Sequence, residues 1–207
     1  MYRVNDIFYS LQGEGRNTGR AAVFIRFAGC NLRCPFCDTE FDSYREMTGE
    51  DIIAAIAALA PLPGEGNGGG PLVVLTGGEP TLQADEAFVD LLHQHGYEVA
   101  MESNGTRPAP MNLDWLTVSP KVNEKLEVRN EKWRQPDEVK IVFDENTDPA
   151  AVISHFSFLM PHLLFLQPCD TGDPVRNRRI TQACVEYVKQ HPQWHLSLQT
   201  HKLIDIP

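Results

Sequence analysis

The sequence has no hydrophobic run that approaches the roughly 20 residues of a transmembrane helix. Its first ten residues, MYRVNDIFYS, also lack the apolar segment of a secretory signal peptide. We therefore expect a cytoplasmic protein without membrane contact, in a compartment that keeps thiols reduced.

Basic residues are too few to balance the acidic ones. Lysine and arginine number 18 against 28 aspartates and glutamates, which gives a formal net charge of −10. Because nucleic-acid binding depends on the neutralisation of phosphates, this charge argues against direct binding of DNA or RNA as the main activity. In a tRNA-related pathway, such a protein would act on a small molecule.

Cysteine is scarce, with five residues in a chain of 207, and three of the five fall in one short segment. The other two are Cys169 and Cys184. Cys184 lies in an amphipathic helical pattern, where a free cysteine behaves as a small core hydrophobe. Cys169 follows a predicted strand, at a turn where we expect the backbone to matter more than the thiol.

The cysteine-rich segment reads Cys30-Asn31-Leu32-Arg33-Cys34-Pro35-Phe36-Cys37, with C-x3-C-x2-C spacing. Three thiolates this close in sequence can face one ligand. A tetrahedral zinc ion and a fully ligated cubane cluster both require four ligands. Either a distant Cys or His completes a zinc site, or one iron of a cluster stays open for a substrate or cofactor. The spacing alone leaves both possibilities open.

Short apolar runs alternate with helical patterns along the chain, for example strands at 22–27 and 139–143 and helices at 85–95 and 174–190. This alternation predicts an α/β fold with parallel strands and outer helices. We count about six parallel strands, which are too few for a closed (β/α)₈ barrel. We therefore expect residues 1–207 to form a single domain with an open, partial (β/α) barrel.

Polar and glycine-rich motifs follow the predicted strands, namely the cysteine segment, TGGEP at 76–80, ESNGT at 102–106, SPK at 119–121, QPCD at 167–170 and QTHK at 199–202. Ligands of parallel α/β sheets bind at the carboxyl ends of the strands, so we expect these motifs to converge on one mouth. Arg26 interrupts the apolar strand at 22–27. A buried charge is costly unless paired, which predicts an anionic partner from the protein or from a substrate.

The cysteine spacing, with Phe36 before the third cysteine, and the sequence Gly77-Gly78-Glu79-Pro80 resemble the cluster and GGEP motifs of the radical S-adenosylmethionine (SAM) enzymes. The resemblance implies that Cys30, Cys34 and Cys37 hold a [4Fe-4S] cluster whose open iron binds SAM. The reduced cluster of that superfamily cleaves SAM to a 5′-deoxyadenosyl radical. The GGEP turn would hold the amino group of SAM, with Glu79 as the acceptor.

Nearly the whole chain resembles the 7-carboxy-7-deazaguanine synthase family of queuosine and deazapurine biosynthesis, through LQGEG, FIRFAGCNLRCPFCDT, TGGEP, SPK, LQP and LSLQTHKLIDIP. The resemblance implies a shortened radical SAM barrel that converts 6-carboxy-5,6,7,8-tetrahydropterin to 7-carboxy-7-deazaguanine with loss of ammonia. It also implies catalytic use of SAM, a Mg²⁺ ion, a flavodoxin-like or ferredoxin-like reductant, and a homodimer.

The resemblance assigns roles position by position. The implied substrate-binding residues are Leu11, Gln12, Gly13, Glu14, Arg26, Thr76, His201 and Pro207, the last through its free carboxylate. The implied cofactor-binding residues are Gly77, Gly78, Glu79, Ser103, Asn104, Ser119, Pro120, Lys121, Gln167, Pro168, Cys169 and Asp170. Thr39 would bind Mg²⁺ through its hydroxyl. The implied catalytic residues are Arg26, which would pair with the substrate carboxylate, and Glu14 and His201, which are alternative bases for the loss of ammonia.

Other functions share part of this pattern. An activating enzyme for a glycyl-radical enzyme or an anaerobic ribonucleotide reductase has the same cysteine spacing but acts on a protein glycine. The LQGEG and QTHK motifs favour a buried small substrate instead. A non-catalytic zinc module and a scaffold with a vestigial site are further alternatives, and the intact ligand-type residues argue against the scaffold. The polar segment 123–136 is either a surface loop or a dimer contact.

Overall fold

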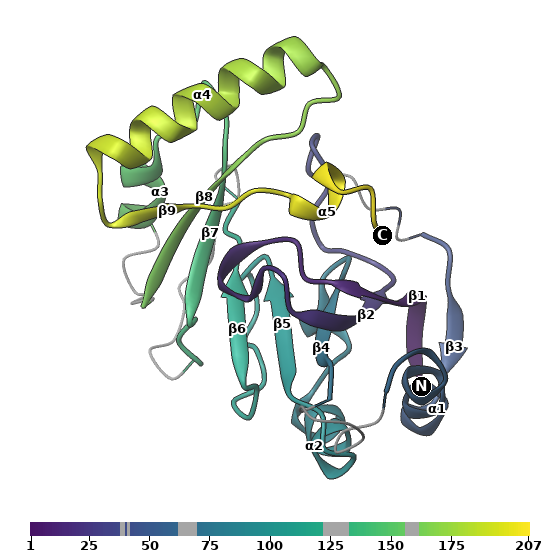
Figure 1. Cartoon of the computed structure of the whole chain (residues 1–207). Helices are drawn as coiled ribbons and strands as arrows, with labels where there is room; N and C mark the ends of the chain where they lie inside the picture. Colours follow the sequence, from purple (N-terminus) through teal and green to yellow (C-terminus); the bar gives the residue numbers. More distant parts are fainter. Residues whose placement is uncertain (38–39, 41, 62–69, 122–132, 156–161) are drawn as a thin grey trace.

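The computed structural model describes residues 1–37, 40, 42–61, 70–121, 133–155 and 162–207. These residues form a sheet with strand order β3-β1-β2-β4-β5-β6-β7-β8-β9 (Figure 1). The strands are β1 (Tyr2–Leu11), β2 (Ala21–Phe27), β3 (Arg45–Met47), β4 (Leu72–Gly77), β5 (Val99–Ser103), β6 (Trp115–Val118), β7 (Glu138–Phe143), β8 (Leu163–Pro168) and β9 (Trp194–Leu196). The helices are α1 (Gly49–Leu59), α2 (Glu86–Gln94), α3 (Pro149–His155), α4 (Pro174–Gln190) and α5 (Thr200–Leu203), with short 3₁₀ turns η1 (Gly15–Asn17) and η2 (Pro80–Leu82).

Parallel pairing runs without interruption from β2 through β4, β5, β6, β7 and β8 to β9. The sheet therefore has seven parallel strands where the sequence predicted about six, and β1 and β3 add an antiparallel edge. The predicted α/β class and open, partial barrel are confirmed. The sequence analysis did not predict β3 or α5, because three or four residues are too few to show a periodic pattern.

Helices α1, α2 and α4 begin at clear capping signals. Thr48 and Asp51 form a reciprocal capping box at the start of α1, and Asp85 caps α2. Asp173 caps α4, whose first residue is Pro174, a residue that suits the first turn of a helix. The helices predicted at 85–95 and 174–190 agree closely with the observed bounds of α2 and α4, since a capping side chain satisfies the backbone N–H groups that the first turn leaves unpaired.

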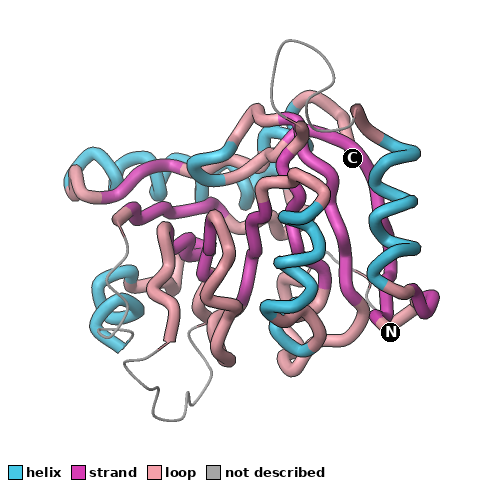
Figure 2. The backbone as a smooth tube through the Cα atoms, turned by 90° about the horizontal axis from the view of Figure 1, so that it is seen from below, coloured by secondary structure: helices cyan, strands magenta, loops and turns pink. Residues whose placement is uncertain are grey.

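The two faces of the sheet have different environments. Alternate strand residues on the outer face pack against the apolar sides of α1 and α2, including Ile52, Ile56, Phe88 and Leu92. Helix α4 contributes Ile180 and Cys184 to the same core, which confirms the predicted core position of Cys184. Figure 1 shows α4 across the end of the sheet that holds β7, β8 and β9, and Figure 2 shows α1 and α2 on the outside of the strands.

The inner face of the sheet is apolar near the amino ends of the strands and carries charged and polar side chains nearer their carboxyl ends. Ala22, Leu72, Val74 and Ala100 form a small second core there. Further along the same strands the inward residues become Arg26 and Thr76, which are register partners on β2 and β4. In the parts of the chain that the structure describes, no helix has the length and hydropathy needed to cross a membrane.

Candidate active site

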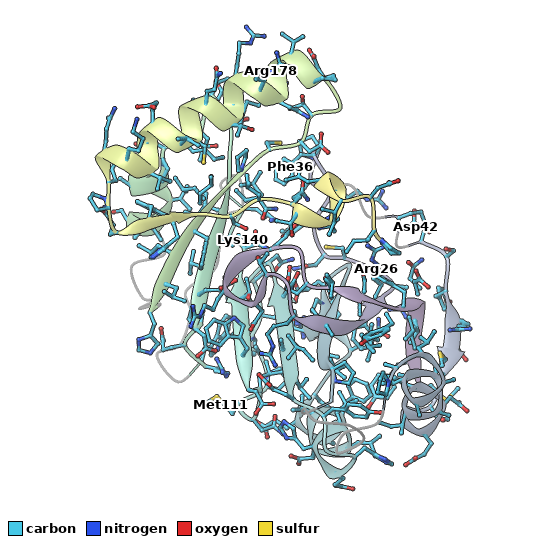
Figure 3. All side chains as sticks on the ribbon, viewed as in Figure 1. Arg26, Phe36, Asp42, Met111, Lys140 and Arg178 are labelled. Carbon is cyan, nitrogen blue, oxygen red and sulfur yellow. The ribbon has the colours of Figure 1, made fainter. Side chains whose placement is uncertain are left out.

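The carboxyl ends of the parallel strands surround a cavity of about 280 Å³. Three of its lining residues, Arg26, Phe36 and Lys140, lie around the C-terminal segment in Figure 3. The predicted site residues that line the cavity are Leu11, Gln12, Gly13, Glu14, Arg26, Cys30, Cys34, Cys37, Thr76, Gly77, Gly78, Ser103, Asn104, Ser119, Lys121, Gln167, Pro168, Asp170, His201 and Pro207. The strand-end motifs therefore meet at one mouth, as parallel strand polarity predicts.

Three of the predicted site residues that the structure describes do not line this cavity. Pro120 is buried behind it, and Cys169 packs in the main core, where its backbone N–H donates to the carbonyl oxygen of Phe143 over 2.8 Å. Glu79 is also fully buried. Thr39, the predicted Mg²⁺ ligand, lies outside the described residues.

The three cysteines line one end of the cavity, with Cys37 exposed and Cys30 and Cys34 half-buried. Among the described residues, no set of three Cys, His, Asp or Glu side chains lies close enough together to bind a single metal ion. A zinc site needs four such ligands on one ion, whereas a cubane cluster places each thiolate on a different iron and keeps the sulfurs apart. Three thiols at one end of the cavity are the number of protein ligands that a cluster with one open iron requires.

Two glycines allow the end of β4 to contact the cysteine segment. A Cβ atom on Gly78 would overlap the carbonyl oxygen of Gly29, one residue before Cys30. Gly77 has a φ of 107°, and a Cβ atom there would overlap the backbone of Phe27. The N–H groups of Gly78 and Glu79 donate to the carbonyl oxygens of Phe27 and Gly29, both over 2.9 Å. The Gly-Gly sequence is thus required by contact between two protein segments, as well as by any approach of a cofactor.

Glu79 connects the end of β4 to the end of β5. Its carboxylate accepts hydrogen bonds from the Thr81 hydroxyl at 2.6 Å, the Ser103 hydroxyl at 2.9 Å and the Asn104 backbone N–H at 2.8 Å. This position differs from the expected direct contact with SAM, because the protein's own donors surround the carboxylate. Asn104 continues the connection to the cysteine segment, since its side-chain amide donates to Asn31 over 3.0 Å.

Lys121 lies between the SPK motif and the cysteine segment. Its ammonium group donates to the Ser119 hydroxyl over 2.8 Å and lies 5.6 Å from the centre of the Phe36 ring. Burial lowers the pKa of Lys121, because the apolar surroundings disfavour the charged amine. An anionic ligand in the cavity would offset the effect of burial and stabilise the charged ammonium group of Lys121.

Arg26 has no carboxylate partner among the described residues. The side chain is half-buried, and its guanidinium carbon lies 4.7 Å from the centre of the Phe8 ring. The sequence analysis allowed a protein or a substrate anion as its partner, and the described structure supplies only an aromatic ring. A guanidinium group that lines the cavity and has no carboxylate partner among the described residues is suited to bind a carboxylate of a ligand.

Lys140, on the inner face of β7, has the opposite environment. Its ammonium group forms ion pairs with Glu14 and with Glu102, the latter at 3.1 Å. Burial alone would lower the pKa of Lys140, but Glu102 and Glu14 outweigh this effect and raise it above the ordinary lysine value. Burial alone would likewise raise the pKa of Glu14, but Lys140 outweighs it and lowers the pKa to about 2. All three residues line the cavity.

The C-terminal segment, the yellow end of the chain in Figure 1, contributes Gln199, His201 and Pro207 to the cavity wall. The Thr200 N–H and hydroxyl donate to the carbonyl oxygen of Gly13 over 3.0 and 2.9 Å. The His201 ring lies so close to Gly13 that a Cβ atom on that glycine would overlap it. At the far end of the segment, the Ser10 hydroxyl donates to a Pro207 oxygen over 2.7 Å. These contacts hold α5 against the LQGEG motif.

Comparison with protein families matches residues 24–122 to the Radical SAM superfamily. A 7-carboxy-7-deazaguanine synthase of Bacteroides thetaiotaomicron is 46% identical over 100% of this chain and 99% of its own length. One of Nitratidesulfovibrio vulgaris is 44% identical with the same coverage. The chain belongs to the 7-carboxy-7-deazaguanine synthase family.

The fold agrees with this assignment. A crystal structure of QueE from Escherichia coli superimposes with a TM-score of 0.75 and 30% identity, over 95% of this chain and 93% of that one. Members of the 7-carboxy-7-deazaguanine synthase family are radical SAM enzymes, so the cofactors are a [4Fe-4S] cluster and SAM. The predicted family, fold and enzyme class are confirmed. The roles of individual residues stay predictions.

The sequence analysis missed several residues of the synthase cavity, namely Phe8, Phe24, Leu32, Glu102, Lys140, Val142 and Gln199. Lys140 had a usable signal, because it interrupts the apolar strand Val139 to Phe143 just as Arg26 interrupts its own strand. Glu102 is the first residue of the ESNGT motif and Gln199 is the first residue of the QTHK motif, but neither was predicted as a site residue. The apolar residues carried no signal, since alternation along a strand does not say which face lines a cavity.

Proposed function

We propose that the cavity binds 6-carboxy-5,6,7,8-tetrahydropterin and that the enzyme converts it to 7-carboxy-7-deazaguanine with loss of ammonia. The observation that carries the proposal is Arg26, a cavity-lining cation with no carboxylate partner among the described residues. The volume of about 280 Å³ is near the lower limit for small-molecule sites, which favours a compact bicyclic substrate over a peptide loop. The names of the relatives support the same product.

In this proposal, Arg26 binds the substrate carboxylate through charge-assisted hydrogen bonds. Glu14 accepts hydrogen bonds from the guanidine-like edge of the pterin, for which an ionised carboxylate is required. Leu11, Gln12, Gly13, Thr76 and Pro207 complete the substrate wall. Because parts of this wall come from β1, β2, β4 and the C-terminal segment, substrate binding depends on the correct packing of all four.

The loss of ammonia requires a base, for which Glu14 and His201 are the two candidates, and their surroundings support different roles. Glu14 has a pKa of about 2 and is paired with Lys140, so its carboxylate is ionised but only weakly basic. His201 lies over Gly13, the neighbour of Glu14 in the chain, and lines the same cavity. We infer that His201 takes the proton and that Glu14 binds the substrate.

Cys30, Cys34 and Cys37 would hold the [4Fe-4S] cluster, and three protein ligands leave one iron for SAM. The cluster with SAM supplies a 5′-deoxyadenosyl radical to the cavity. The residues proposed to line SAM are Gly77, Gly78, Ser103, Asn104, Ser119, Lys121, Gln167, Pro168 and Asp170. Pro120, Cys169 and Glu79 support these residues from behind the wall, Glu79 through its hydrogen bonds to Ser103 and Asn104.

The metal ion, the reductant, the homodimer and the fate of the product are proposed from family resemblance. Thr39 would bind a Mg²⁺ ion, whose preference for oxygen ligands suits a hydroxyl and a substrate carboxylate. A flavodoxin-like or ferredoxin-like protein would reduce the cluster. The chain would act as a single domain within a homodimer, and its product would feed queuosine synthesis and tRNA modification.

The test is an anaerobic product assay with the reconstituted enzyme, a reductant, SAM, Mg²⁺ and the carboxytetrahydropterin, followed by mass spectrometry. We expect 7-carboxy-7-deazaguanine, with SAM not consumed in proportion to product. Omission of SAM should abolish the product. An active cluster that cleaves SAM but yields no deazaguanine would overturn the proposal and favour an activating enzyme that acts on a protein glycine.

A further inference from the structure

Lys140 is the residue of the cavity whose role is least explained by the proposed reaction. It extends from β7 into the interior (Figure 3), with a side chain only 4% exposed. A lysine this deeply buried loses the solvation of its charge and persists as a cation only when carboxylates compensate. Glu14 and Glu102, from the loop after β1 and from β5, supply that compensation.

Each of these carboxylates is held at both oxygens. One oxygen of Glu14 accepts from Lys140, and the other accepts from the Gln199 amide over 3.0 Å. One oxygen of Glu102 accepts from Lys140 over 3.1 Å, and the other accepts from the Gln12 amide over 2.7 Å. Five residues from four segments of the chain therefore form one hydrogen-bonded row along the cavity, with Lys140 at its centre.

We propose that Lys140 is a positioning residue that acts on the substrate through Glu14 and Glu102. It keeps both carboxylates ionised, close together and fixed in direction, as paired acceptors for a ligand edge rich in N–H donors. The inference rests on the proposed function, which supplies the amino-pyrimidinone edge of a pterin as that ligand. Lys140 itself need not touch the substrate.

The physical reason is the mutual repulsion of two carboxylates in one buried site. Without a cation between them, one of the pair takes up a proton, as in carboxylate pairs of acid proteases. A protonated carboxyl group has lost part of its acceptor capacity and would present an O–H to the substrate's N–H groups. With Lys140 in place, the row carries two negative charges and one positive charge, and the remaining negative charge favours donor groups of a ligand.

Other charged and titratable groups face this row and bear on its behaviour with pH. Glu138, beside Lys140 on β7, accepts hydrogen bonds from Thr117 and from the Arg16 backbone, and burial raises its pKa. Lys121 lies after β6 and His201 on α5, and both interact electrostatically with the row. The test must therefore separate the effect of Lys140 from titration of these neighbours.

The test compares Lys140→Met, which removes the charge at similar length, with Lys140→Arg, which keeps it. Infrared difference spectra of the cofactor-free proteins at pH 7 should show a protonated carboxyl group in Lys140→Met that is absent from the wild type and from Lys140→Arg. Because Lys140 lowers the pKa of Glu138, the comparison is repeated with Glu138→Gln in both proteins, so that the new signal comes from Glu14 or Glu102. A Lys140→Met spectrum without a protonated carboxyl group would overturn the inference.

The kinetic readout separates positioning from folding. At pH 7 the KM of Lys140→Met for the pterin should rise about a hundredfold, with a smaller effect on kcat. As the pH increases and the carboxyl group ionises, the KM should fall back toward the wild-type value, which a purely structural defect would not produce. A KM raised equally at every pH would contradict the proposal. If Lys140→Met does not fold, Lys140→Gln carries both measurements with the same expectations.

Lys189→Met is the matched control, because Lys189 is an exposed lysine on α4 with a surface ion pair to Glu186. It should match the wild type in both measurements. A wild-type enzyme that forms no deazaguanine would remove the proposed function, yet the infrared result would still decide whether Lys140 keeps the two carboxylates ionised. Failure of the proposed function and failure of the inference about Lys140 therefore give different results.

Discussion

Arg26 and Lys140 are both strand cations in the cavity wall, and their surroundings assign them different tasks. Lys140 is neutralised by two protein carboxylates, whereas Arg26 meets the face of Phe8 and no carboxylate among the described residues. Lys140 is therefore paired with carboxylates of the protein itself, and Arg26 is available to bind a ligand. A charge in an apolar strand is thus a sign of function only after its partners are known.

Replacement of Arg26 by methionine should weaken binding of the carboxytetrahydropterin by about 2–5 kcal/mol, since it leaves the substrate carboxylate without its charged partner. Steady-state kinetics with the natural substrate and with an analogue that lacks the carboxylate measure this loss. Only the carboxylated compound should be affected. Arg178→Met, on the exposed surface of α4, is the control. Equal losses for both compounds would assign Arg26 a structural role instead.

Glu14 makes stability depend on pH in a defined window. Its pKa is lowered from 4.5 to about 2 in the folded protein, so its ion pair stabilises the fold above pH 4.5 and is lost as the pH falls toward 2. The unfolding free energy of the cofactor-free wild type should therefore fall more steeply between pH 4.5 and 2 than that of Glu14→Gln. Urea titrations at several pH values measure both slopes. Identical slopes would show that Glu14 is not ionised by Lys140.

At the scale of elements, the site is built by contacts between strand ends. The β4 turn packs on the cysteine segment through glycines, Glu79 joins β4 to β5, and α5 packs on the loop after β1. Each motif therefore has a partner motif in the protein as well as a proposed ligand. This explains why glycine is required at Gly78, where φ is ordinary but no side chain fits.

Gly78→Ala should displace the β4 turn from Gly29 and destabilise the protein by about 1–3 kcal/mol through overpacking. The cysteine segment should shift with it, so less iron should be retained per chain after reconstitution. Gly172→Ala is the matched control, because Gly172 has a φ of 75° but open space around it. That variant should show only modest strain, with full iron content. Normal iron content and stability in Gly78→Ala would contradict the packing argument.

At the scale of the whole molecule, most of the architecture could be predicted from the sequence because strand and helix signals are local. Apolar periodicity marked the strands and helices, and the position of the motifs after strands predicted which strand ends form the cavity. The edge strand β3 and helix α5 were missed because they are very short. Glu79 was assigned to a ligand because a sequence motif shows which residues are near the site but not which way they point.

The site residues that could not be predicted from the sequence are those whose partners lie far away in the chain. The row from Gln12 to Gln199 joins residues separated by up to 187 positions in the chain, by contacts between four segments that no periodicity reveals. The sequence marked Lys140 only as a charge within an apolar strand, and its partners Glu14 and Glu102 are known only from the structure. The family resemblance supplied individual roles, and the structure supplied the partners that make those roles physically possible.

The most direct test of the account is Mössbauer spectroscopy of the ⁵⁷Fe-reconstituted enzyme, with and without SAM. The account predicts a [4Fe-4S] cluster in which SAM changes the environment of a single iron, because Cys30, Cys34 and Cys37 hold the other three. Cys37→Ala should lose this signal. A protein that binds no iron, or a cluster whose four irons are all unaffected by SAM, would contradict the assignment of this cavity.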